Sequence, residues 1–393
     1  MRIASVEAFP IRLQRNRQAT QRTAGSPTAL KAGDATYRWS TTVPALYSSF
    51  FETALIKIST SEGLTGWGES QAPLAPEVAC TIVEHLLRPV LLGAEFFGGT
   101  NEIADLWNLM YRTMRVRGQT GGFMLDAISG VDIALWDLAG KIRGVSVSRL
   151  LSDSPRDTVA AYLSGVPGEG PEQRAMTVNQ YRAEGFRTFK LFHEASPDEL
   201  LSIFDAVSQM AGAGVRIAVD GLWRFEPETA LAFGRELDRR NALWFEAPLA
   251  PESAEAHAHL ARSLRTPIAI GESYRTRFEM APFFVSGAVG FAQPDIGRTG
   301  ITEGRRIANQ AAQHGAVVVP HLSIALGPQI AAAIHFSAAT EGCVSLEFNP
   351  AVLKTANQYL VKPLVLRNAQ YLVPDGPGLG IDLLERELLE DCV

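Results

Sequence analysis

The sequence predicts an α/β fold, a modified (β/α)8 TIM barrel with an α+β capping domain built from both termini. Short apolar runs alternate with helical patterns across 158–349, as in a chain of β/α units. No GxGxxG turn follows the first of these runs, which disfavours an open, doubly wound, dinucleotide-binding sheet. Both ends of the chain show the alternation typical of strands, so we expect them to form the second domain together.

Each apolar run is expected to be one barrel strand. Helical patterns lie between the runs, for example at 197–212, 227–240 and 302–314. The eight runs are TVAAYLS, FRTFKLF, VRIAVD, LWFEAP, PIAIGE, GFAQPD, AVVVPHLS and SLEFN.

The predicted division is a capping domain at 1–125, a barrel at 126–353 and a C-terminal segment at 354–393 that packs back on the capping domain. A polar stretch at about 14–49 interrupts the first strands, and a loop of that length in a compact domain is typical of a functional lid. The segment at 127–144 is apolar almost all round, which predicts a buried helix that ends near a glycine.

Composition favours a protein that acts on a small molecule. The chain has 393 residues and a net charge of −6, without the basic stripe that a nucleic-acid binder needs. Its three cysteines form no CxxC pair, so we expect neither a disulfide framework nor a zinc site, and a cytoplasmic location fits. Polar residues interrupt every long apolar tract, so we expect no signal peptide and no membrane span.

Polar side chains recur at the ends of six of the predicted strands. The separations between them are 26, 26, 23, 26 and 26 residues, the length of one strand, one helix and two loops. Because the carboxyl ends of barrel strands converge on one face, these side chains should surround one site. They are Asp220, Glu246, Glu272, Asp295, His321 and Glu347.

Three acidic residues on consecutive strands, Asp220, Glu246 and Glu272, predict a site for a divalent cation. Magnesium suits carboxylate oxygens and leaves positions open for water or substrate. A single carboxylate at a strand end often only caps the next helix or pairs with an arginine. Three carboxylates at equivalent positions on consecutive strands favour the metal site.

Asp295 and His321 end the next two strands and form a candidate catalytic pair. A carboxylate beside an imidazole fixes its tautomer and raises its basicity, as a general base near neutral pH requires. A lone histidine in an apolar run is more often a core residue. The aspartate one repeat earlier favours catalysis here.

Three further residues complete the predicted site. Lys190 lies inside an apolar strand, and a buried lysine needs a partner, so it should point at the acidic centre and bind a substrate carboxylate or move protons. Glu347 could, when neutral, donate a hydrogen bond to an oxygen that becomes negative, or it could pair with a local cation. His193 has the opposite strand parity to Lys190 and points away unless the strand has already ended.

These residues resemble the enolase superfamily, and its mandelate racemase subgroup in particular. The resemblance covers nearly the whole chain and implies a capping domain around a modified barrel. It implies that Asp220, Glu246 and Glu272 bind Mg2+, that Asp295 and His321 form a His-Asp dyad, and that Glu347 is the electrophile of the eighth strand. The phrases that carry it are GWGES at 66–70, AISGVDIALWDLAGKIRG at 127–144, FRTFKLF at 186–192, FEAP at 245–248, GES at 271–273, QPDIGRTGITE at 293–303 and VPH at 319–321.

Two positions depart from the family pattern. Where the second strand often reads Lys-x-Lys, this chain has Phe192, so a two-base racemase is disfavoured and a one-base elimination is favoured. Where the third strand often has Asn two residues after its Asp, this chain has Leu222, which leaves substrate contacts there open.

We therefore expect a Mg2+-dependent dehydratase of a sugar acid, an aldonate or aldarate. It would remove the α-proton to give an enediolate and eliminate water to give a 2-keto-3-deoxy acid, with His321 or Lys190 as the base. The lid would set specificity, and we also expect a homo-oligomer. Candidate substrate-binding residues are Arg22, Arg38, Trp39, Tyr47 and His193.

Two alternatives remain open from the sequence. One is a racemase, epimerase or cycloisomerase on a carboxylate, in which His193 replaces the missing lysine. The other is a catalytically silent barrel that binds an acid sugar. Inversion at Cα without keto acid would select the first, and failure to bind Mg2+ would select the second.

Overall fold

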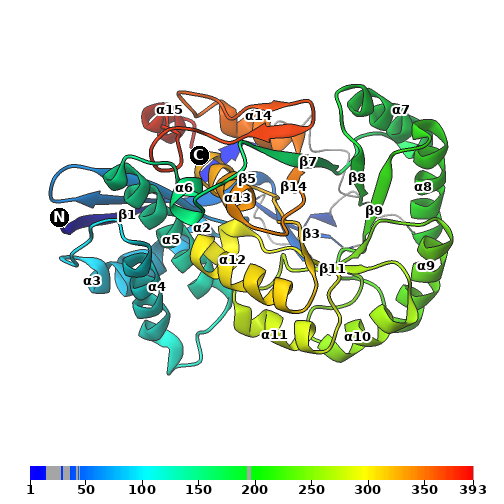
Figure 1. The fold of residues 1–393 in the computed structure, drawn as a ribbon, viewed down its shortest axis with the longest axis horizontal. Helices are drawn as coiled ribbons and strands as arrows, with labels where there is room; N and C mark the ends of the chain where they lie inside the picture. The colour runs from blue at the N-terminus through cyan, green and yellow to red at the C-terminus, as the bar shows by residue number, and fades with distance from the viewer. Residues whose placement is uncertain (15–27, 30–35, 41–42, 44, 193–195, 393) are drawn as a thin grey trace.

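The computed structural model describes residues 1–14, 28–29, 36–40, 43, 45–192 and 196–392. Figure 1 shows two bodies side by side, a sheet covered by helices and a ring of strands surrounded by helices. The sheet is the antiparallel meander β1 (Ile3–Gln14), β5 (Phe50–Thr60) and β6 (Thr65–Ser70). Its helices are α2 (Pro76–Ile82), the π-helix η1 (Val83–Leu87), α3 (Arg88–Leu91), α4 (Thr100–Arg115) and α5 (Gly122–Arg143).

Helix α5 is the buried helix that the sequence predicts, and it ends at Gly144, whose φ of 66° is the left-handed conformation of a C-cap. It packs against β6 at a point where no side chain fits. A Cβ on Gly68 would lie 1.9 Å from the carbonyl oxygen of Gly130, and one on Gly66 would lie 2.3 Å from that of Ala134. The glycines of the GWGES phrase thus let the strand and the helix meet backbone to backbone.

The eight predicted barrel strands are all present. Neighbouring strands from β7 to β13 pair in parallel, β14 pairs with β7, and a bridge between Val318 and Cys343 joins the last gap. The strands are β7 (Thr158–Ser164), β8 (Thr188–Leu191), β9 (Arg216–Asp220), β10 (Phe245–Glu246), β11 (Ile268–Ile270), β12 (Phe291–Ala292), β13 (Val317–Val318) and β14 (Leu346–Phe348).

Helices surround these strands, as the alternating pattern predicts. They are α6 (Val147–Leu151), α7 (Gly170–Ala183), α8 (Pro197–Ala211), α9 (Pro227–Arg239), α10 (Ala254–Ser263), α11 (Arg277–Val285), α12 (Ile296–Gln313), α13 (Gly327–Ala339) and α14 (Pro350–Asn357). Together with the capping sheet, they confirm the predicted fold class.

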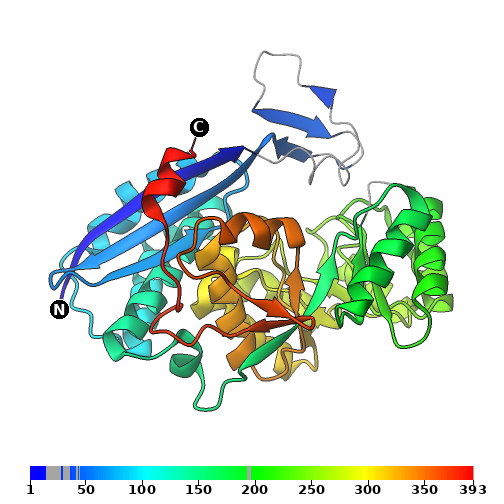
Figure 2. The same ribbon diagram turned by 90° about the horizontal axis from the view of Figure 1, so that it is seen from above.

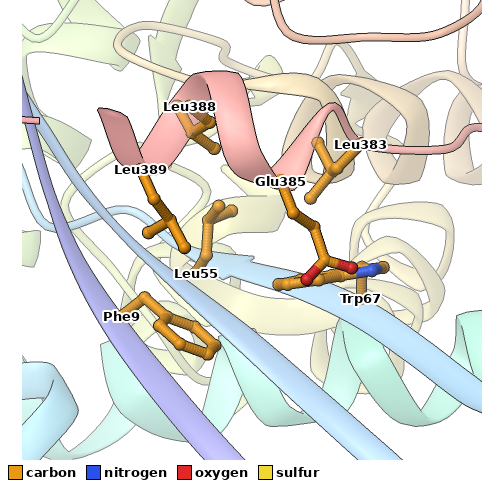
Figure 3. A pocket seen from close by; sticks show the side chains of 7 residues that line it. All are labelled: Phe9, Leu55, Trp67, Leu383, Glu385, Leu388 and Leu389. Carbon is orange, nitrogen blue, oxygen red and sulfur yellow. The ribbon is translucent and has the colours of Figure 1, made fainter. Parts of the chain in front are cut away.

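The C-terminal segment contacts both bodies. The hairpin β15 (Leu366–Arg367) and β16 (Gln370–Leu372) adds to the barrel strand β7. Helix α15 (Glu385–Glu390) then lies on the capping sheet (Figure 2), where Lys57 and Glu385 form a 2.8 Å ion pair. Figure 3 shows the small pocket at this contact, whose apolar lining is Phe9, Leu55, Trp67, Leu383, Leu388 and Leu389.

A second small sheet is formed by β2 (Thr28–Ala29), β3 (Tyr37–Ser40) and β4 (Ala45–Ser48). Figure 2 shows it set off from the barrel, beyond the end of β1 and β5. Its base is tied to the capping sheet because Glu52 accepts hydrogen bonds from Tyr37 (3.2 Å) and Ser48 (2.5 Å). Among the helices of the described ranges, none is long and apolar enough to cross a membrane.

Candidate active site

The six polar residues at the strand ends lie next to one another around the barrel. Asp220 and Glu246 are partners in the parallel register of β9 and β10. Asp295 and His321 form the corresponding bridge where β12 and β13 end. Glu347 lies on β14, which closes the ring against β7. The regular spacing in the sequence therefore corresponds to neighbouring positions at one end of the barrel.

Lys190 lies at the centre of the acidic residues. Its Nζ is 2.5 Å from Glu246, 2.9 Å from Glu347 and 3.5 Å from Asp220, and the side chain is 2% exposed. Burial lowers the pKa of Lys190, but the carboxylates of Glu246 and Glu347 outweigh it and hold that pKa well above its ordinary value. Lys190 is therefore a cation that three carboxylates share.

Two residues that hold Glu246 in place are not among the candidates predicted from the sequence. Its Oε2 accepts hydrogen bonds from the Trp244 indole (2.9 Å) and the Gln293 amide (2.7 Å), while Oε1 contacts Lys190. Strand parity could have identified both donors, since Trp244 lies two residues before Glu246 and Gln293 lies two before Asp295.

His321 is held between two carboxylates. Its Nδ1 is 2.6 Å from Asp295 Oδ2, and its Nε2 is 2.7 Å from Glu272 Oε2. Burial lowers the pKa of His321, but Glu272 and Glu347 raise it well above its ordinary value, with a further contribution from the Asp295 hydrogen bond. The ring is therefore an imidazolium in this arrangement.

Asp295 is itself fixed by the element that follows it. Its Oδ1 accepts hydrogen bonds from the backbone N–H of Gly297 (2.8 Å) and the amide of Gln329 (3.1 Å), which leaves Oδ2 for His321. Gln329 packs so close to Gly297 that a Cβ at that glycine would lie 2.2 Å from the amide carbon. Because Asp295 holds Nδ1, it orients the imidazole so that Nε2 points into the site.

Glu347 is ionised in this arrangement. Burial raises its pKa, but Lys190 and His321 outweigh burial and lower it below the ordinary value. Its Oε2 accepts a hydrogen bond from the backbone N–H of Leu322 at 2.9 Å. Of the two roles expected for Glu347, the arrangement here is the pairing with a local cation, Lys190.

Three of the predicted substrate-binding residues lie in the part of the chain that the structure describes. Arg38, Trp39 and Tyr47 lie on the small sheet that Figure 2 shows set off from the barrel, and Trp39 is 40% exposed. Arg22 and His193 lie outside the described residues. Phe192 stands in place of the second lysine, and its ring packs against Gly165 at the end of β7. The contact is so close that a Cβ on Gly165 would lie 2.6 Å from the ring.

The carboxylates have the chemistry of a magnesium site. Among the described residues, no three His, Cys, Asp or Glu side chains are arranged here as a metal-ligand set. The three predicted ligands are kept apart by their ion pairs. Lys190 lies between Asp220 and Glu246, while His321 contacts Glu272. Oxygens of Asp220, Glu246 and Glu347 already surround one cation, the Lys190 ammonium. Carboxylate oxygens are hard donors of the kind that fit Mg2+.

The fold and the ring of polar side chains define a class of protein, the barrel enzymes that act at the carboxyl ends of their strands. The family models "Mandelate racemase / muconate lactonizing enzyme, N-terminal domain" and "Enolase C-terminal domain-like" match residues 48–152 and 173–387. The chain belongs to the enolase superfamily, in its mandelate racemase subgroup. Members of this superfamily typically bind Mg2+.

Three relatives illustrate the similarity. A D-galactarolactone cycloisomerase from Agrobacterium fabrum is 33% identical over 349 residues, 86% of this chain and 90% of the relative. A D-galactonate dehydratase from Xanthomonas campestris pv. campestris is 32% identical over 354 residues, 84% of this chain and 88% of the relative. The solved structure of a putative isomerase from Sinorhizobium meliloti has a TM-score of 0.93 and 32% identity, with 100% of both chains covered.

Proposed function

We propose that this protein is a Mg2+-dependent dehydratase of a sugar acid, an aldonate or an aldarate. The observation that carries the proposal is the position of His321, with Asp295 on one ring nitrogen and the acidic ring on the other. Similarity to D-galactonate dehydratases supports the choice of substrate class.

His321 is the proposed base. The contact of Nε2 with Glu272 favours the protonated ring, so His321 would lose that proton to solvent when Glu272 turns to Mg2+. The neutral Nε2 would then take the α-proton while Asp295 holds Nδ1 and stabilises the imidazolium that forms. The electron pair of the C–H bond forms a C=C bond between Cα and the carboxyl carbon, and a carboxylate oxygen gains the negative charge of an enediolate. When that C=O bond re-forms, the pair moves to a Cα=Cβ bond and the C–O bond to the β-hydroxyl breaks. The hydroxyl leaves as water with a proton from His321, and the enol that remains tautomerises to the 2-keto-3-deoxy acid.

The acidic residues and Lys190 complete the proposed machinery. Asp220, Glu246 and Glu272 would hold Mg2+, which when bound would make the α-proton more acidic by polarising the substrate carboxylate. Lys190 would turn from the carboxylates to the substrate carboxylate, or act as the base with His321 protonating the leaving hydroxyl. Glu347 would donate a hydrogen bond to the substrate oxygen that gains negative charge, a role that requires its carboxyl group to be protonated once Lys190 has turned to the substrate.

Phe192 supports elimination over racemisation. Inversion at Cα needs a second proton-transfer group opposite the first, and a phenyl ring has no exchangeable proton. The lid at about 14–49, with Trp39 and Tyr47 among its described residues, is proposed to select the distal part of the sugar acid.

The test is a screen of mono- and diacid sugars with Mg2+ for keto acid formation. On the substrate found, His321→Asn is expected to lower the dehydration rate by about 10²–10⁴-fold and to abolish exchange of the α-proton with solvent deuterium. His259→Asn, at an exposed histidine on α10, is the matched control and should leave the rate unchanged. A His321→Asn variant that still dehydrates and exchanges would refute the assignment.

A second candidate is a cycloisomerase, which the similarity to a D-galactarolactone cycloisomerase favours. In this second proposal His321 would again remove the α-proton, so the same residues would serve both reactions. Mass spectrometry of the product separates them, because an isomer keeps the mass of the substrate whereas a dehydration product is lighter by one water.

A further inference from the structure

The loop after β9 has an unusual backbone. Leu222 and Trp223 both have φ of 57°, and two consecutive non-glycine residues in the left-handed region are rare because Cβ crowds the backbone there. Two hydrogen bonds hold the loop in place. The N–H of Leu222 donates to Asp220 Oδ1 (2.9 Å), and that of Trp223 donates to the carbonyl of Ala247 (2.7 Å). Strain of this kind persists where the surroundings impose a particular side-chain position.

The position imposed is that of the Trp223 indole. Its Nε1 donates a 2.5 Å hydrogen bond to Glu272 Oε1, while Glu272 Oε2 contacts His321. Two rings pack edge-on against the indole, Tyr274 at 6.0 Å and His257 at 6.1 Å between centroids. Tyr274 is in turn fixed by a 2.7 Å hydrogen bond to the carbonyl of Pro251. The indole thus has few orientations available besides the one that reaches Glu272.

We propose that Trp223 is a positioning residue for Glu272. It fixes one oxygen of that carboxylate so that the other faces the centre of the site. The inference rests on the proposed function, because it concerns the carboxylate assigned to Mg2+. It extends to Glu272 the arrangement already seen at Glu246, whose Oε2 is held by the indole of Trp244. A side chain that orients a metal ligand changes metal affinity without touching the metal.

The experiment is isothermal titration calorimetry with Mg2+ alone, on the full chain, together with the melting temperature of the metal-free protein. Trp223→Phe keeps a ring in contact with Tyr274 and His257 but removes the N–H. It is expected to weaken Mg2+ binding by about 10–100-fold and to leave the metal-free melting temperature unchanged. Trp107→Phe is the matched control, because that indole lies on α4 and its Nε1 makes no hydrogen bond in the structure.

The outcomes separate this inference from the proposed function. Equal Mg2+ affinity in wild type and Trp223→Phe would overturn the role of Trp223 and leave the proposed function standing. No Mg2+ binding by the wild type would overturn the proposed function itself. If Trp223→Phe lowers the metal-free melting temperature, Trp223→His tests the positioning role instead, because it restores a ring N–H. Binding tighter than in the Phe variant supports positioning, and equal binding contradicts it.

Discussion

A single ammonium among three carboxylates governs the site at the scale of residues. Lys190 neutralises part of a buried negative charge that the fold would otherwise hold without a cation. Burial and the neighbouring Glu246 carboxylate raise the pKa of Asp220 well above its ordinary value even with Lys190 present, so the ring is short of positive charge. A divalent cation would supply that charge.

Removing the ammonium should therefore destabilise the metal-free protein. Lys190→Met is expected to lower the free energy of unfolding by about 3–5 kcal/mol, because it leaves buried carboxylates without their partner. Mg2+ should restore part of the loss. Urea unfolding with and without Mg2+ measures both effects. Lys362→Met, at a lysine whose pairing with Asp375 is exposed, should change stability by less than about 1 kcal/mol. Equal stability of the two variants would contradict this account of Lys190.

At the scale of elements, the contact between β6 and α5 joins the capping sheet to the helix layer. Glycines on both sides let the two backbones approach, so the GWGES phrase has a packing role as well as a polar one. Glu69 from the same phrase is buried and accepts hydrogen bonds from Leu326 (2.7 Å) and Gln329 (3.0 Å) at the start of α13. Since Gln329 also contacts Asp295, β6 is connected to the His-Asp pair.

Gly68→Ala should disrupt this contact. The added Cβ would overlap the Gly130 carbonyl, and overpacking of a buried backbone contact costs typically about 1–3 kcal/mol of unfolding free energy. Gly99→Ala is a suitable comparison, because a Cβ there meets only the flexible side chain of Glu102, at 3.3 Å. Denaturant midpoints of the two variants give the answer. A Gly68→Ala protein as stable as Gly99→Ala would show that the strand and the helix can move apart freely.

At the scale of the whole molecule, a buried histidine joins three distant segments. His335 on α13 accepts a 3.3 Å hydrogen bond at Nδ1 from the backbone N–H of Ser148 on α6, and its Nε2 donates to the carbonyl of Leu379 at 3.1 Å. Burial lowers its pKa to about 4, so it is neutral in the folded protein near pH 5, where the unfolded chain would be protonated.

The sign of the pH effect follows from that difference. Because the folded pKa lies below the unfolded one, the stabilisation from neutral His335 is complete above about pH 6.5 and is lost as the pH falls towards 4. Between about pH 7.5 and pH 5 the loss is about 2 kcal/mol. His335→Gln should remove this share of the acid sensitivity in urea unfolding, although it is less stable overall.

Other groups do not obscure that comparison. Burial raises the pKa of Glu69 and of Asp132 to about 7, so both stabilise the fold as the pH falls, and they do so equally in wild type and variant. His259→Gln at an exposed position serves as the control. An unchanged pH dependence in His335→Gln would contradict the assignment.

The regular spacing of strand-end residues was enough to predict the barrel and the neighbourhood of the polar ring. Repeats of about one strand and one helix are local features of the chain, and the parallel barrel topology converts them directly into positions around a circle. The place of Lys190 inside an apolar strand likewise predicted that it points at the acidic residues, because a buried ammonium is costly without a partner.

The sequence by itself thus determined the fold class, the set of polar residues at the strand ends and the presence of Phe192 where the family pattern often has a second lysine. Only the tertiary structure decided which groups pair within that set: Lys190 with three carboxylates, His321 with Glu272 as well as Asp295, and Trp223 with Glu272. The physical reason is that hydrophobic periodicity, which predicts strands and helices, is a local property of neighbouring residues. Hydrogen-bond partners, by contrast, depend on loop conformation and rotamers, and on side chains brought together from distant elements.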